Sequence, residues 1–152
     1  MSKFLSSPYL IISLVWLVVI LNFLGLHFGW YWQNWHFDKI NHFLGGFFVG
    51  GVFFYFFQKK TVVLDLRGNW LITFVLVLGF TALVGVCWEL FEFSLDQILG
   101  IGQKVTPLIA QGNVADTMGD LFFDLLGSGF FAIVYWKFVL FQGDRHVTGN
   151  EV

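Results

Sequence analysis

The sequence predicts an all-α fold: a polytopic integral membrane protein built as a four-transmembrane-helix bundle with both termini in the cytoplasm. Hydrophobic residues make up 57% of its 152 residues and charged residues only 12%, against about 25% charged residues in an ordinary soluble domain. Four apolar segments are each about as long as the roughly 20 residues that a helix needs to cross a bilayer. We therefore expect a single membrane domain over residues 1–152, not a water-soluble globule.

The predicted helices follow one another along the chain. They cover about residues 9–29, 38–58, 69–97 and 117–141, with an outer loop at 98–116 and a cytoplasmic tail at 142–152. The first apolar segment is longer than that of a cleaved signal peptide, and large residues follow it where a small-residue cleavage site would lie. We therefore expect it to remain as a membrane anchor.

Glycine pairs mark the second predicted helix at Gly45–Gly46 and Gly50–Gly51. Small residues about four positions apart let helix backbones approach closely in lipid. The pattern therefore favours tight packing inside the bundle over a direct functional role.

Basic residues set the predicted orientation, because cytoplasmic connections of membrane proteins carry an excess of Lys and Arg. Six of the eight lie on the side that holds both termini: Lys3, Lys59, Lys60, Arg67, Lys137 and Arg145. We expect a multi-pass protein of the cytoplasmic (inner) membrane with membrane lipids as partners. The net charge of -2 gives no indication of a nucleic-acid partner.

Acidic residues gather at the opposite, outer end of the predicted bundle. Seven of the ten lie at the start of the second helix, the end of the third and the start of the fourth: Asp38, Glu89, Glu92, Asp96, Asp116, Asp120 and Asp124. Spacings of three and four residues place those of each helix along one face. Because lipid penalises ionised side chains, we expect the three polar stripes to face one another or a water-filled pocket.

Helix capping is the alternative role for Asp38, Asp116 and Asp120, since carboxylates are favoured at helix N-termini. Capping does not account for Glu89 and Glu92, which lie at a C-terminal helix end where the macrodipole opposes them. Lys39, beside Asp38, could orient a phosphate head group or form an interfacial ion pair.

The sequence therefore predicts one outer-leaflet site with six candidate catalytic residues: Asp38, His42, Glu89, Glu92, Asp120 and Asp124. Carboxylates with one His suit Mg, Ca, Mn, Zn or Fe. A divalent metal is the expected cofactor, with His42, Glu89, Glu92 and Asp120 as its ligands. A carboxylate pair working as general acid and base without a metal stays open.

Three runs of sequence carry a family resemblance: WYWQNWHFDKINHFLGGFFVG, GVCWELFEF and NVADTMGDLFFDLLGS. Together they resemble the YjdF-like bacterial inner-membrane proteins over about Trp30 to Gly127. More remotely, the Asp38-Lys39-x-x-His42 start of one helix resembles the VanZ-like family. The chain departs from the VanZ-like pattern because no Gln follows Glu89 and because an acid stands at position 124. The resemblance implies a small polytopic membrane protein and no particular chemistry.

Three functions stay open at this level, and whether the protein is an enzyme is undecided. The first is a metal-assisted enzyme or binder that acts on a lipid-linked or envelope substrate. The second is a non-catalytic assembly or regulatory subunit of the cell envelope. The third is a proton- or cation-linked transporter, but the polar stripes lie at one end of the bundle only. For the first function, a ferritin-like di-iron centre is not expected, because Glu89-x-x-Glu92 lacks the His of that motif.

Overall fold

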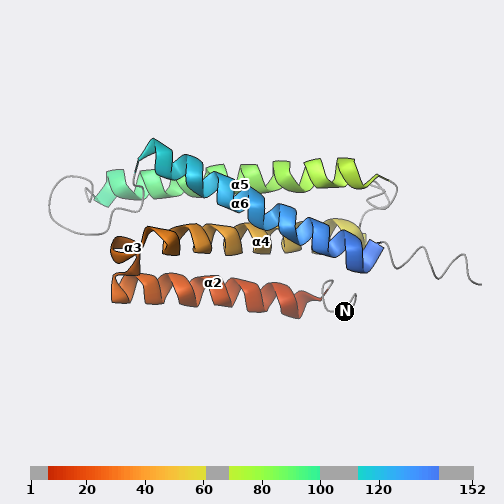
Figure 1. Cartoon of the computed structure of the whole chain (residues 1–152), viewed down its shortest axis with the longest axis horizontal. Coiled ribbons are helices and arrows are strands. Elements are labelled where there is room, and N and C mark those ends of the chain that lie inside the picture. The colour runs from red at the N-terminus through yellow and green to blue at the C-terminus, as the bar shows by residue number, and fades with distance from the viewer. Residues whose placement is uncertain (1–6, 61–68, 100–112, 141–152) are drawn as a thin grey trace, which may run out of the picture.

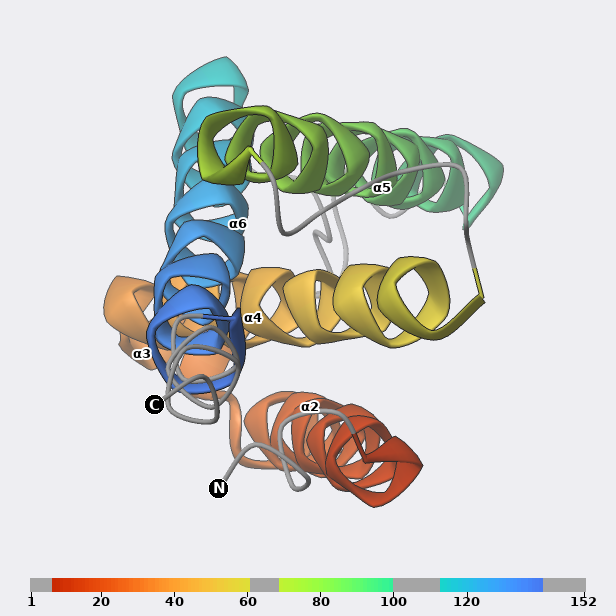
Figure 2. The same cartoon turned by 90° about the vertical axis from the view of Figure 1, so that its right-hand side faces the viewer.

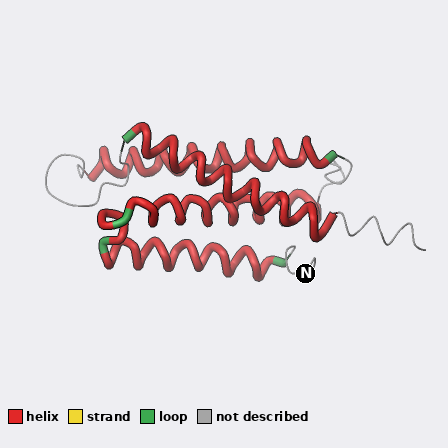
Figure 3. Tube along the Cα trace, in the orientation of Figure 1, coloured by secondary structure: helices red, strands yellow, loops and turns green. Residues whose placement is uncertain are grey.

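The computed structural model describes residues 7–60, 69–99 and 113–140, and the secondary structure in these ranges is entirely helical (Figure 3). The elements are α2 (Pro8–Phe28), α3 (Trp30–Gln33), α4 (Trp35–Lys60), α5 (Trp70–Leu99), α6 (Val114–Tyr135) and the π-helix η2 (Trp136–Leu140). Within these ranges four segments are long and apolar enough to cross a membrane: Pro8–Phe28, His36–Phe57, Trp70–Ile98 and Val114–Phe138. The predicted all-α class, with four helices long and apolar enough to span a membrane, is confirmed.

Several helix ends differ from the prediction, and α4 begins at Trp35 instead of residue 38. Gly29 ends α2 in the left-handed conformation with φ 69°, and the chain then forms the short helix α3 before α4 begins. Helix α6 begins at Val114, three residues earlier than expected, because the Asn113 side chain accepts hydrogen bonds from the N–H groups of Ala115 and Asp116. Most of the predicted outer loop, residues 100–112, and the predicted tail, residues 142–152, lie outside the described residues.

Helix α6 is the helix through which α4 and α5 are mainly connected. It packs against both α4 and α5, whereas α2 packs against α4. Figure 1 shows α2, α4 and α5 running along the same direction with α6 crossing them obliquely, and Figure 2 shows α2 and α5 on opposite sides of α4. The start of α4, the end of α5 and the start of α6 lie at one end of the bundle (Figure 1).

The backbones of α4 and α6 are in direct contact. A Cβ atom added at Gly46 would overlap the backbone of Asp124, and one added at Gly127 would overlap the carbonyl of Phe43. A Cβ at Gly50 would lie 3.2 Å from the Cα of Ser128. Gly46 and Gly50 therefore act as packing residues, which is the role that their spacing indicates.

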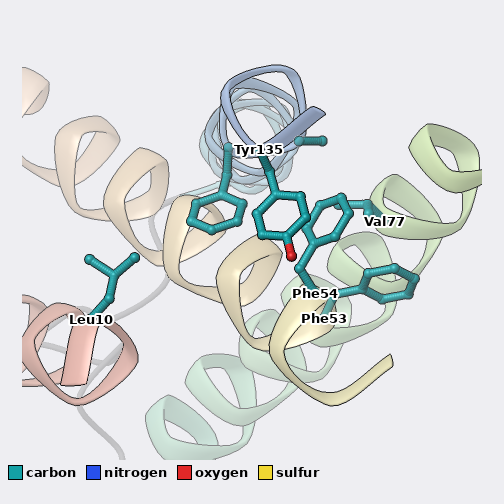
Figure 4. Close-up of a cluster of buried hydrophobic side chains, with 7 residues drawn as sticks. Leu10, Phe53, Phe54, Val77 and Tyr135 are labelled. Atoms are coloured by element: carbon teal, nitrogen blue, oxygen red, sulfur yellow. The ribbon is translucent and has the colours of Figure 1, made fainter. Parts of the chain in front are cut away.

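An aromatic core fills the half of the bundle away from that end. The rings of Phe54 and Tyr135 stack with their centroids 4.1 Å apart, and Phe53 and Val77 are buried beside them. Figure 4 shows these side chains between α4, α5 and α6, with Leu10 separate on α2. Offset aromatic pairs of this kind add about 0.5–1.5 kcal/mol beyond their buried area. Close packing therefore holds this half together.

We expect Gly46→Ala and Gly127→Ala each to lower the thermal unfolding temperature of the detergent-purified protein, because the added methyl group forces α4 and α6 apart. Overpacking of this kind costs about 1–3 kcal/mol. Gly79→Ala is the matched control, since a Cβ at Gly79 meets nothing within 4 Å. Equal unfolding temperatures for Gly46→Ala and Gly79→Ala would show that the helices do not approach as closely as described.

Candidate functional site

Polar side chains from three helices meet at the end of the bundle opposite the aromatic core. We call this group the polar cluster: Asp38, Lys39, His42, Glu89, Glu92, Asp116, Asp120 and Asp124. Several of its members are buried, among them Asp120, which is 3% exposed, and Glu89, which is 6% exposed. Burial of ionisable groups at this density requires that they compensate one another's charge.

Lys39 is the centre of one side of the cluster. Its Nζ lies 2.6 Å from Oδ1 of Asp116, 2.6 Å from Oδ1 of Asp120 and 3.2 Å from Oδ2 of Asp38. An ammonium group has three N–H donors, and these three carboxylates can take all of them. Lys39 therefore forms the ion pair with Asp38 that the sequence suggests, and it is also a buried counter-ion for Asp116 and Asp120.

The imidazole ring of His42 lies between carboxylates on both of its nitrogen sides. Nδ1 is 3.4 Å from Oδ1 of Asp124, while Nε2 is 3.6 Å from Oδ1 of Asp120 and 3.8 Å from Oδ1 of Asp38. These distances exceed the 2.7–3.2 Å of ordinary N–H···O hydrogen bonds. The ring is therefore close enough to share a ligand or a proton with these carboxylates without being locked to any one of them.

Two overlapping groups of side chains have the spacing of metal ligands. Ligand atoms of Asp38, His42 and Asp120 lie within 4.8 Å of one another, and so do those of His42, Glu89 and Glu92. Metal–ligand bonds of about 2.0–2.6 Å allow two ligands of one ion to lie at most about 4–5 Å apart. The structure thus brings together all six residues that the sequence singled out, because Asp124 adjoins the shared His42. Their binding and catalytic roles stay predictions.

The cluster carries more negative than positive formal charge. It contains six carboxyl groups, and Lys39 is the one Lys or Arg that the structure describes beside them. An Asp at a helix centre in the membrane costs about 2.5–3.5 kcal/mol. Protons, water or a bound cation must therefore compensate the excess.

A cavity of about 560 Å³ adjoins the polar cluster between α2, α4 and α5. Four members of the cluster line it: Asp38, His42, Glu92 and Asp124. The rest of the lining is largely apolar, with Val15, Val19 and Phe23 among the residues that α2 contributes. The cavity therefore combines a polar end with an apolar wall, as ligand pockets commonly do.

Four polar residues that line this cavity are not among the predicted site residues: Asn22, Tyr31, Asn41 and Thr81. The Nδ2 group of Asn41 donates a 2.7 Å hydrogen bond to the Tyr31 hydroxyl. Burial raises the pKa of Tyr31 to about 12, so that phenol keeps its proton at neutral pH. The Asn41 Oδ1 and Thr81 Oγ1 atoms are buried without a hydrogen-bond partner. The spacing of Thr81 and Glu89, two turns apart on one helix face, could have indicated Thr81.

We expect Lys39→Met to lower the unfolding temperature strongly, because it leaves Asp116 and Asp120 without their counter-ion. Removing one partner of a buried ion pair costs about 3–5 kcal/mol. The double variant Lys39→Met/Asp120→Asn should regain part of that stability, which thermal unfolding in detergent will measure. Lys137→Met, at an exposed position near the other end, is the control. No difference between the two Lys variants would contradict the buried counter-ion.

Comparison with known proteins places the chain among membrane proteins. Residues 3–140 match the family described as predicted membrane protein, DUF2238. An uncharacterized protein of Thermotoga maritima is 36% identical over 116 residues, which are 75% of this chain and 55% of that protein. The chain therefore spans about 55% of the length of this relative. No solved structure matches. Because the family match extends over nearly the whole sequence, this chain belongs to the DUF2238 family of predicted membrane proteins.

Proposed function

We propose that the protein binds a divalent cation in the polar cluster. With this cation it acts as an enzyme or a binding protein for a lipid-linked or envelope substrate. The observation that supports this most directly is the position of His42, which lies within 4.8 Å of the ligand atoms of Glu89 and Glu92. One imidazole nitrogen with two carboxylates suits Zn, Mn or Fe, whereas Mg and Ca favour oxygen ligands alone.

Charge favours the side of the cluster formed by His42, Glu89 and Glu92. The ammonium group of Lys39 already contacts Asp116 and Asp120 on the other side. A second positive charge at His42 would offset the remaining carboxylates. Asp124 would then act as the carboxylate that orients a metal-bound His through its second nitrogen, as in many metal sites.

The expected chemistry follows from the position of this site at the cavity edge. A divalent cation polarises a carbonyl or phosphoryl oxygen and makes a bound water more acidic. Asp38 lines the cavity beside it, where a carboxyl group can donate or accept a proton during a reaction. The site thus supports hydrolysis or group transfer at the polar end of a lipid-linked molecule.

The aromatic core argues against the alternative of a transporter. Phe53, Phe54, Phe131 and Tyr135 fill the other half of the bundle, and each is at most 4% exposed. A relay for protons or cations would need polar groups along this half. Among the buried side chains that the structure describes there, the polar groups are the hydroxyls of Thr73, Ser128 and Tyr135, and none is charged.

We expect the protein, purified in detergent without chelator, to contain one divalent ion per chain by elemental mass spectrometry. His42→Ala and Glu89→Gln should each remove most of it, because they delete a ligand. His27→Ala is the matched control, since His27 is exposed on α2 and stacks on Phe23 outside the cluster. Metal content that is zero in the native protein, or unchanged by His42→Ala, would refute the cation site and favour an assembly role.

The orientation is also a proposal: both termini in the cytoplasm and the polar cluster in the outer half of the cytoplasmic membrane. In a Cys87→Ser background, single cysteines at Lys60 and Gln103 should label from opposite sides. Impermeant maleimide added to intact cells should modify Gln103→Cys, and should reach Lys60→Cys only after the cells are opened. Labelling of Lys60→Cys in intact cells would reverse the orientation that the basic residues indicate.

A further inference from the structure

The cavity beside the polar cluster has the size and the lining of a site for an amphiphile. Its volume of about 560 Å³ lies in the range of about 300–1,000 Å³ found for ligand pockets. Val15, Val19 and Phe23 of α2 give it an apolar wall, and Asp38, Glu92 and Asp124 lie at its polar end. Figure 2 shows α2 and α5, which both contribute to the lining, standing apart on either side of α4.

Hydrogen-bond acceptors without a donor lie beside the cavity, together with three carboxylates. Asn41 uses its N–H group on Tyr31, so its unpartnered, buried atom is the acceptor Oδ1. Asn41 is 7% exposed and Thr81, whose hydroxyl also has no partner, is 1% exposed. Ionised carboxylates accept hydrogen bonds and donate none. A cation with N–H donors therefore complements both the charge of these carboxylates and the unpaired Oδ1 atom of Asn41.

We infer that the cavity binds an amphiphile that has a protonated primary amine at its polar end and an apolar chain as its tail. This inference rests on the proposed action on a lipid-linked substrate, because it names the chemical class of that substrate. The three N–H groups of an ammonium would be shared between Asn41 Oδ1 and the carboxylates that line the cavity. The chain would lie against the apolar residues of α2.

Substitution of a glycine that lines the cavity by a larger residue would fill the cavity. The one atom within 4 Å of a Cβ at Gly45 is Oδ1 of Asp124, at 3.8 Å. Gly45 also lines the cavity, so a larger side chain at this position extends into the cavity beside the Asp124 carboxylate. Gly45→Leu should therefore displace the amphiphile without the overlap with the α6 backbone that a Cβ at Gly46 would cause. Gly79→Leu is its control, because Gly79 faces open space and is not part of the lining.

The test is native mass spectrometry of the protein released from nanodiscs that contain matched pairs of lipids. Phosphatidylethanolamine and phosphatidylcholine share their chains and charge but differ in N–H donors. Hexadecylamine and hexadecyltrimethylammonium form the second pair. We expect roughly tenfold greater retention of the N–H-bearing member, since an unsatisfied buried acceptor costs about that factor. Preference in the first pair identifies a membrane lipid headgroup, and preference in the second pair alone identifies a free long-chain amine.

Variants decide whether the preference arises in this cavity. Asn41→Leu and Thr81→Val should reduce it, and Gly45→Leu should abolish retention of the amine, with unfolding temperatures showing that each variant is folded. Equal retention within both pairs, or retention unaffected by Gly45→Leu, would overturn the inference. Metal content is measured in the same samples. If the native protein contains metal but shows no preference for the amine, only the amphiphile site is refuted. If it prefers the amine but contains no metal, only the cation site is refuted.

Discussion

The direct contact between the backbones of α4 and α6 is the constraint on which the candidate site depends. Gly46 meets the backbone of Asp124, and Gly127 meets the backbone of Phe43. Any larger side chain at these positions would separate the two helices. At this spacing the Nζ atom of Lys39 on α4 lies 2.6 Å from Oδ1 of Asp120 on α6. Small residues thus fix the distance at which charged groups of two helices can compensate each other.

Charge compensation then determines which functions the bundle can support. On one side of the polar cluster Lys39 forms ion pairs with three carboxylates. On the other side the ring of His42, which belongs to both groups of candidate metal ligands, lies among carboxylates. Ionisable groups in a membrane are tolerated when they are paired, when they reach water or when they bind an ion. The packed aromatic core stabilises the other half of the bundle. The polar groups that could carry chemistry are therefore concentrated at one end.

The sequence predicts the helices and the meeting of the acidic residues, but it does not predict the cavity. Composition and segment length predict the four helices, because the bilayer fixes the length of a spanning helix. Helical spacing and alternating chain direction predict that Asp38, His42 and Glu89 meet, because both depth and face follow from position. The burial of Lys39 and the cavity depend on how α2 and α6 are rotated against α4. The nearly uniform apolar surface of α2 does not encode its rotation, so Asn41 and the cavity could not be predicted.

Asp124 shows how packing and site formation are joined in the same residues. Gly45, Gly46 and Gly85 all lie against it, and a Cβ at Gly85 would be 2.8 Å from its Oδ2. The space around this carboxylate therefore exists because α4 and α5 carry no side chain at these three positions. That space lets an acid occur inside an apolar helix and still reach both His42 and the cavity. The adjacent glycines of α4 thus have different roles, since Gly46 seats α6 while Gly45 keeps the cavity open.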